Sequence, residues 1–266
     1  MTDPSILVEC RAGYRVLTLN RPDRLNAFND AMHRELRQAI DDAEVNASCR
    51  ALMITGAGRG FSGGQDLNDR VVKPGEKMPP STSLEQYYNP LVRRLRALPF
   101  PVVAAVNGVA AGAACNIALA CDIVIAARSA SFVQSFARIG LIPDSGGTWF
   151  LPRLVGDARA RGLALLAEPL PAEKAEQWGL IWKCVDDASL IAEARKLCEH
   201  FAAAPTQGLA LIKRALDASA TNTLDAQLDL ERDLQNVARE TPDYAEGVRA
   251  FMEKRKPNFT GRKEKN

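Results

Sequence analysis

Predicted strands and helices alternate along most of the chain, and this alternation is the feature that most limits its fold. "SILVEC" and "YRVLTLN" flank a short glycine-containing turn and predict a β-hairpin. Further buried strands are predicted at "RALMITG", "PVVAAVNG", "CDIVIAAR" and "GLIWKCV". Segments with the apolar spacing of helices lie between these strands, and Pro90 indicates a break in one of them. After about Asp157 the predicted elements are mostly helices. This order predicts an α/β core followed by a helical C-terminal extension.

Composition is ordinary for a soluble globular protein and points to no macromolecular partner. The 266 residues, 47% apolar and 25% charged, are enough for one large domain or for one domain plus an appendage. A net charge of +2 gives no reason to expect nucleic acid or a membrane surface as a partner. The most apolar stretch, residues 101–127, is interrupted by Asn107, Asn116 and Asp122, so we expect no membrane span there. Residues 69–80 are polar and contain proline, and they predict a mobile loop.

The cysteines and histidines indicate neither a disulfide framework nor a metal site. None of the six cysteines forms a C-x-x-C pair, and the two histidines, His33 and His200, lie far apart in the sequence. The start "MTDPSILVEC" does not resemble a signal peptide, and the end "GRKEKN" is no targeting address. We therefore expect reduced thiols, no metal and a cytoplasmic location.

Two glycine-rich segments each follow a predicted buried strand. They are residues 58–64 and residues 107–115, separated by one strand–helix unit. Small side chains let a ligand approach backbone N–H groups, so the two segments could direct two donors at one oxygen, as in an oxyanion hole. A flexible surface connection is the simplest alternative for the first segment.

The first segment also matches two short motifs that we do not favour. It contains G-x-G-x-x-G, but no helix follows to hold a dinucleotide pyrophosphate. It contains G-x-S-x-G around Ser62, but a serine hydrolase needs a strand–turn–helix elbow and a downstream histidine. The only downstream histidine, His200, falls within a predicted amphipathic helix. Labelling of Ser62 by a fluorophosphonate would support this alternative.

Seven segments, in this order, resemble the crotonase (enoyl-CoA hydratase/isomerase) superfamily: "LNRPDRLNAFN", "ITGAGRGFSGGQDL", "PVVAAVNGVAAGA", "ACDIVIAARSASF", "GLIPDSGGTWFLPRLVG", "AEKAEQWGLIWKCV" and "GVRAFMEKRKPNFTG". The resemblance implies a spiral core of repeated ββα units over residues 1–200. It implies a helical C-terminal region, 201–266, that forms homotrimers or dimers of trimers. It also implies an acyl-CoA substrate, with no cofactor besides the coenzyme A of the substrate.

The resemblance also assigns site residues by position. The backbone N–H groups of Gln65 and Ala113 would form the oxyanion hole. Coenzyme A would contact Arg24, Ala27, Gly64, Asp66, Leu67, Gly112, Phe251 and Lys254, the last two often on a neighbouring subunit. The acyl pocket would be lined by Tyr87, Tyr88, Asn116, Phe136 and Trp149. The alternatives are that Arg24 and Lys254 are plain surface charges, that Asp66 shapes its own loop, and that the aromatic residues belong to the core.

One acid, Asp144 in "GLIPDSGGT", carries the chemistry that the resemblance implies. Hydratases of the superfamily use two glutamates, and their positions are held here by Asn116 and Phe136. Neither residue is a general base, so hydration is disfavoured. An apolar pocket would raise the pKa of Asp144 toward neutrality, and one carboxylate can move a proton from one carbon of an enolate to another. There are three alternatives: an enzyme that uses Asp144 as a nucleophile, a generic enoyl-CoA hydratase/isomerase, and a non-catalytic acyl-CoA-binding scaffold.

Five segments narrow the resemblance to the isomerase branch that acts on ring-epoxidised phenylacetyl-CoA: "FSGGQDLNDR", "YYNPLVRRLRALP", "IVIAARSASFV", "GLIPDSGGTWFLPR" and "TNTLDAQLDLERD". That branch implies conversion of the ring epoxide to an oxepin. It also implies a possible shift of a Δ3 double bond to Δ2, and association with a related hydratase.

Overall fold

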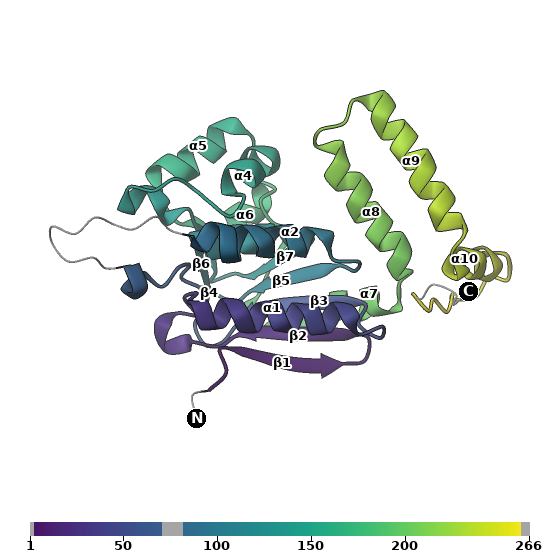
Figure 1. Ribbon diagram of the computed structural model, residues 1–266, viewed down its shortest axis with the longest axis horizontal. Coiled ribbons are helices and arrows are strands. Elements are labelled where there is room, and N and C mark those ends of the chain that lie inside the picture. The colour runs from purple at the N-terminus through teal and green to yellow at the C-terminus, as the bar shows by residue number, and fades with distance from the viewer. Residues whose placement is uncertain (1–2, 71–81, 262–266) are drawn as a thin grey trace.

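Two β-sheets form the core of the computed structural model, which describes residues 3–70 and 82–261. The larger sheet has six strands in the order β1-β2-β3-β5-β7-β10 (Figure 1). Their bounds are β1 Ile6–Arg11, β2 Tyr14–Leu19, β3 Ala51–Gly56, β5 Val102–Val106, β7 Ile123–Ala127 and β10 Lys183–Val185. The first two form the predicted antiparallel hairpin, and all other neighbours are parallel. Every strand that the sequence predicted is present.

The smaller sheet consists of four short strands, β4-β6-β8-β9. They span Gly60–Ser62, Val109–Ala111, Ser131–Val133 and Leu170–Pro171. Each of β3, β5 and β7 is followed along the chain by one of these short strands, so the structure repeats a strand–strand–helix unit. The predicted fold of repeated ββα units is confirmed.

Helices and the second sheet cover both faces of the central strands β3, β5 and β7, which fits the apolar residues on both faces of these strands. Helix α7 (Leu190–Ala203) packs against all three, while α1 (Asp30–Val45) packs against β1 and β2. The remaining helices of the core are α2 Asn89–Ala97, α3 Ala113–Leu119, α4 Gly147–Val155, α5 Asp157–Leu166 and α6 Ala172–Gln177. All six cysteines are free thiols, as expected, and four of them are buried.

Short turns of other helix types connect these elements. They are η1 Pro22–Arg24, η2 Leu67–Arg70, η3 Leu84–Tyr88, η4 Ser135–Ile139 and η5 Asp187–Ser189. The predicted break at Pro90 occurs where the π-type turn η3 gives way to α2, with Pro90 in the first turn of the new helix. The loop predicted over 69–80 lies almost entirely outside the described residues.

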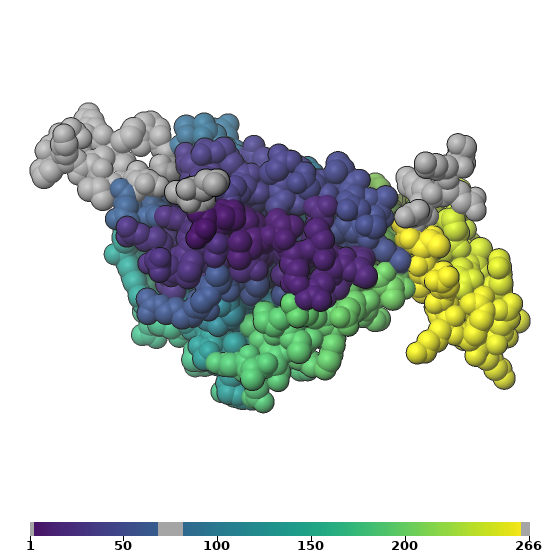
Figure 2. All heavy atoms as spheres, turned by 90° about the horizontal axis from the view of Figure 1, so that it is seen from below, coloured from purple at the N-terminus to yellow at the C-terminus, as the bar shows by residue number. Residues whose placement is uncertain are grey.

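Three C-terminal helices extend from the core: α8 Thr206–Ser219, α9 Leu224–Arg239 and α10 Pro242–Met252. Figure 2 shows the last part of the chain as a lobe beside the core. Lys213 of α8 forms a half-buried ion pair with Asp122, 2.8 Å between Nζ and Oδ2, which holds α8 on the core. Helix α7 runs through residue 200, and the division of the chain at that point stays a prediction. No helix in the described ranges is long and apolar enough to cross a membrane.

Candidate active site

The two glycine-rich segments meet at the start of α3. Gly64 follows β4 with a φ of +89°, and a Cβ placed on it would lie 3.6 Å from the backbone nitrogen of Ala113. Ala113 begins α3, and Gly112 before it has a φ of +54° and provides no side-chain cap. The first N–H groups of a helix have no partner within the helix. Within residues 3–70 and 82–261, neither the N–H of Gln65 nor that of Ala113 donates a hydrogen bond.

The loop that carries Gln65 is held in place on both sides. The Phe28 N–H donates to the Gly64 carbonyl at 2.7 Å, and the Asp66 N–H donates to the Phe28 carbonyl at 2.9 Å. The Tyr88 hydroxyl donates to Oε1 of Gln65 at 3.0 Å. A loop fixed in this way keeps the direction of the Gln65 N–H constant, which an oxyanion hole requires.

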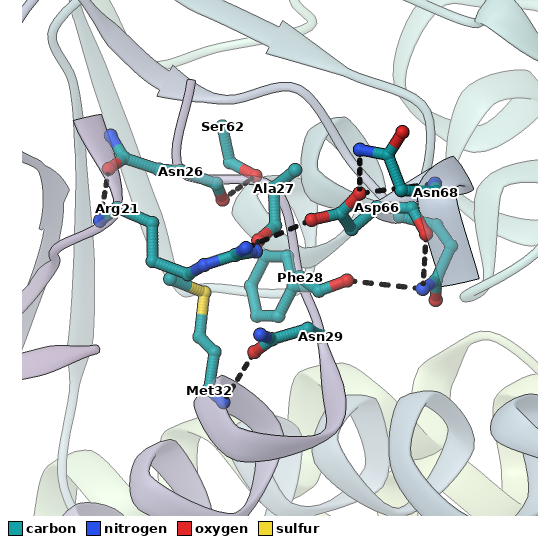
Figure 3. A network of polar contacts seen from close by, with 10 residues as sticks. Arg21, Asn26, Ala27, Phe28, Asn29, Met32, Ser62, Asp66 and Asn68 are labelled. Carbon is teal, nitrogen blue, oxygen red and sulfur yellow. Dashed lines mark hydrogen bonds and ion pairs between the residues drawn. The ribbon is translucent and has the colours of Figure 1, made fainter. Parts of the chain in front are cut away.

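Asp66 shapes this loop, as the structural alternative proposed. It is 7% exposed, and its Oδ2 pairs with Nη2 of Arg21 at 2.9 Å (Figure 3). Burial alone would raise the pKa of Asp66, but hydrogen bonds from Arg21 and Asn68 outweigh it and lower the pKa. Asp66 is therefore a fixed anion bound to Arg21 and is poorly suited to proton transfer.

Ser62 is a buried structural residue. Its Oγ donates to the Asn26 carbonyl at 2.7 Å and accepts from the Gly64 N–H at 3.2 Å. It lies in strand β4 and is fully buried, whereas His200 lies on α7 with an exposed side chain. The structure contradicts the serine-hydrolase alternative because no elbow exposes the hydroxyl.

Asp144 lies half-buried in the turn that enters α4. Its backbone carbonyl accepts from Nδ2 of Asn116 and from the Gly147 N–H, each at 2.8 Å. Its carboxylate Oδ1 accepts from the Ser145 hydroxyl at 2.8 Å. Burial raises the pKa of Asp144, and the Ser145 hydrogen bond opposes this only in part. The carboxyl group therefore has the direction of shift expected of a general base near neutral pH.

The two positions used by hydratases lie around Asp144 and the start of α3. Asn116 is fully buried on α3, and its Oδ1 accepts from Nε2 of Gln134 at 2.8 Å. The ring of Phe136 is 5% exposed, and its Cζ would lie 3.9 Å from a Cβ at Gly112. An amide and a phenyl ring therefore occupy the two positions at which the family resemblance implies the hydratase glutamates.

The predicted aromatic lining is dispersed. The Tyr88 ring is buried and contacts Gln65, whereas Tyr87 stacks on His33 with ring centroids 4.8 Å apart. Trp149 lines a cavity of about 1070 Å³ between α2, α4 and α8, together with Gly146 and Phe150. The structure thus connects Tyr88 to the oxyanion loop and places Trp149 on the wall of this cavity.

The predicted coenzyme A residues fall into two groups. Arg24 and Leu67 are exposed, and Ala27 is half-buried with its carbonyl bonded to Arg21, all close in the fold to the Gln65 loop. Phe251 is 82% exposed on α10, and Lys254 follows that helix with an exposed side chain. Figure 1 shows α10 at the end of the molecule away from β4. One chain therefore does not bring the second group to its own oxyanion loop.

Four supporting residues were missed in the sequence: Arg21, Asn68, Gln134 and Ser145. Arg21 lies inside the segment "LNRPDRLNAFN" and Ser145 directly follows Asp144, so the motifs contained both. No motif or periodic pattern in the sequence singles out Gln134, because its role depends on how strand β8 lies relative to helix α3. Hydrogen bonds between distant segments are not visible in periodicity.

Comparisons with known proteins show what the whole chain is similar to. The family model described as enoyl-CoA hydratase/isomerase matches residues 9–262. The chain is 57% identical to the Escherichia coli K12 protein 1,2-epoxyphenylacetyl-CoA isomerase, over 97% of this chain and 98% of that protein. It is 36% identical to the 2,3-dehydroadipyl-CoA hydratase of the same organism, over 93% and 95%. The crystal structure of an enoyl-CoA hydratase from Bacillus anthracis superposes with a TM-score of 0.88 at 30% identity, over 97% of this chain and 100% of that one.

Proposed function

Because the chain belongs to the enoyl-CoA hydratase/isomerase family, we propose that it isomerises the ring 1,2-epoxide of phenylacetyl-CoA to an oxepin, with Asp144 as the acid/base. The observation that carries the proposal is the half-buried carboxyl group of Asp144, whose pKa is raised by burial and whose backbone carbonyl is held by the Asn116 amide. The 57% identity to a protein named for this activity supports the choice of substrate. A shift of a Δ3 double bond to Δ2 in an enoyl-CoA uses the same groups.

In the proposed mechanism, Asp144 removes a proton from the carbon next to the thioester carbonyl. The electron pair moves onto the carbonyl oxygen, which accepts hydrogen bonds from the N–H groups of Gln65 and Ala113. Preorganised donors of this kind often supply the largest catalytic contribution. In the ring epoxide, the C–C bond shared by the three- and six-membered rings breaks, and its electron pair becomes part of the π system of the seven-membered oxepin, which keeps the oxygen. Asp144 then returns the proton to a carbon further along the conjugated system, so the composition of the thioester is unchanged.

Single-base isomerisation fits this site better than hydration does. Adding water across a double bond requires a group that activates the water and a group that protonates the carbon. Asn116 holds the backbone of Asp144 through its carbonyl oxygen, and the other acid near the oxyanion loop, the buried Asp66, is committed to Arg21. One carboxyl group whose pKa is raised can act first as base and then as acid.

The decisive experiment compares Asp144→Asn with the wild type on a panel of CoA thioesters, with products identified by mass spectrometry. We expect loss of ring-epoxide and 3-enoyl isomerisation, with binding of a non-reacting CoA thioester largely retained. Asp157→Asn, which alters an exposed carboxylate of α5, is the matched control and should behave as wild type. A fully active Asp144→Asn enzyme would refute the assignment.

The same panel tests the alternatives. Exchange of solvent deuterium into the carbon next to the thioester supports a base, whereas a covalent acyl-aspartyl species trapped with an aryl-halide thioester supports a nucleophile. Stoichiometric binding without turnover of any thioester supports a scaffold protein.

We propose a homotrimer or a dimer of trimers, with Phe251 and Lys254 completing the coenzyme A site of a neighbour. Large apolar side chains exposed on α8–α10 support it: Ile212, Leu216, Leu224, Leu228, Val237, Val248 and Met252. Association with a related hydratase stays a prediction. We also propose that the enzyme needs no cofactor beyond the coenzyme A of its substrate, since acid/base transfer and backbone donors supply the chemistry. The six free thiols fit a cytoplasmic location.

A further inference from the structure

The turn that carries Asp144 is strained and needs to be held. Ser145 has a φ of +50° and Gly146 a φ of +85°, two successive left-handed residues. For a residue with a Cβ this conformation costs about 1–2 kcal/mol, so surrounding contacts must fix it. Ser145 is only 2% exposed, which fits a turn that is locked by packing and hydrogen bonds.

Asn116 supplies the main side-chain contact to this turn. Its Nδ2 donates at 2.8 Å to the carbonyl oxygen of Asp144, the residue that bears the reacting group. A Cβ at Gly147 would lie 2.4 Å from this same Nδ2, so the amide packs directly on the backbone at the start of α4. Any movement of Asn116 therefore changes the backbone that aims Asp144.

Gln134 fixes which way the Asn116 amide points. Its Nε2 donates to Oδ1 of Asn116 at 2.8 Å, so this oxygen faces Gln134 and the nitrogen faces Asp144. Both amides are at most 2% exposed, and water does not compete strongly for these bonds. An ionised carboxylate at position 116 accepts hydrogen bonds only, and it could not donate to the Asp144 carbonyl.

Asn116 also ties the base to the oxyanion hole. It lies one helical turn after Ala113, and both belong to the short helix α3. We infer that Asn116 is a positioning residue for Asp144, held in its orientation by Gln134, and that it sets the distance between the base and the oxyanion donors. This inference rests on the proposed function. Position 116, where the resemblance implies a glutamate in hydratases, would then support the base of the isomerase.

Two near-isosteric substitutions test the inference. Asn116→Leu removes the contact to Asp144. Gln134→Met removes the contact that orients Asn116, together with a weaker hydrogen bond of 3.3 Å to Sγ of Cys115. We expect kcat on the ring-epoxide or 3-enoyl thioester to fall about 10- to 100-fold in Asn116→Leu, because small displacements of a catalytic group have effects of this size. The KM should change less than about threefold, since the proposed coenzyme A contacts lie elsewhere. Gln134→Met should show a smaller fall in kcat.

The double variant distinguishes positioning from general damage. If Gln134 acts through Asn116, kcat of Asn116→Leu/Gln134→Met should be no lower than that of Asn116→Leu alone. Thr55→Val is the structural control, because it removes a buried hydrogen bond of 2.8 Å to the Ala105 carbonyl in the large sheet. It should lower the thermal unfolding temperature and leave kcat unchanged.

The outcomes separate this inference from the proposed function. A wild type that turns over no thioester of the panel overturns both. If the wild type is active, two results overturn only the inference. One is a kcat of Asn116→Leu equal to that of Thr55→Val, and the other is that the effects of Asn116→Leu and Gln134→Met on kcat add independently. If Asn116→Leu does not fold, Gln134→Met alone decides: a kcat equal to that of Thr55→Val overturns the inference.

Discussion

Substitution of Gly64 is the simplest test of the oxyanion hole. Its φ of +89° is one that residues with a Cβ rarely adopt, and a Cβ there would lie 2.8 Å from the Ala111 carbonyl oxygen. The left-handed backbone costs about 1–2 kcal/mol, and forcing a methyl group into a packed site costs about 1–3 kcal/mol. Gly64→Ala should therefore lower the free energy of unfolding by about 2–5 kcal/mol.

The larger consequence should be catalytic. The methyl group can be accommodated only if the Gly64 loop and the start of α3 move apart, which separates the N–H groups of Gln65 and Ala113. Loss of one oxyanion donor typically lowers kcat about 10²- to 10³-fold, or about 3–4 kcal/mol. The assay is the steady-state kcat for the isomerised thioester, together with a urea unfolding curve.

Gly179→Ala is the matched control. Gly179 has a φ of +79°, but the nearest atom to its Cβ position is the Leu154 carbonyl oxygen at 3.4 Å, an ordinary contact. Gly179→Ala should lower the free energy of unfolding only by the cost of the left-handed backbone, about 1–2 kcal/mol, and should keep the wild-type kcat. If Gly64→Ala stays within about threefold of this control in kcat, the two N–H groups do not form the oxyanion hole as described.

Two further variants test the electrostatics of the chain. Ser145→Ala removes the hydrogen bond that lowers the pKa of Asp144. The acidic limb of the kcat/KM profile against pH should therefore move to higher pH. An unmoved limb would show that Ser145 does not act on the base. Lys213→Met leaves Asp122 buried without its cation and should cost about 3–5 kcal/mol in urea unfolding at neutral pH. Burial already raises the pKa of Asp122, so the loss should shrink as the pH falls and the carboxyl group protonates; a loss independent of pH contradicts this account.

The strands of the large sheet could be predicted because their sequence pattern is local. "RALMITG" and "PVVAAVNG" are continuous apolar runs, which is the pattern of parallel strands covered on both faces. The strands β4, β6, β8 and β9 have two or three residues each, too few for any period, and only the family resemblance indicated them. Their pairing is what brings Gly64 to Ala113.

The site was predictable where function depends on one residue at one position. Asp144, Gln65 and Ala113 were assigned by their positions in family motifs, and their roles stay predictions; the structure shows that Gly64 and Ala113 lie close together. The support of the base by Gln134 and Asn116 could not be predicted, because it depends on contacts among β8, α3 and the turn before α4. The positions of Phe251 and Lys254 relative to a site depend on a second chain, which no single sequence describes.

The replacement of the hydratase carboxylates changes the chemistry in two ways at once. Phe136 places an apolar ring near Gly112, where the family resemblance implies a hydratase glutamate. Asn116 removes a second charge, and a carboxylate there would repel the ionised Asp144 and could not hold its carbonyl. Restoring a glutamate at position 116 should therefore weaken the isomerase before it gains a hydratase, because the same side chain cannot both activate a water and position Asp144.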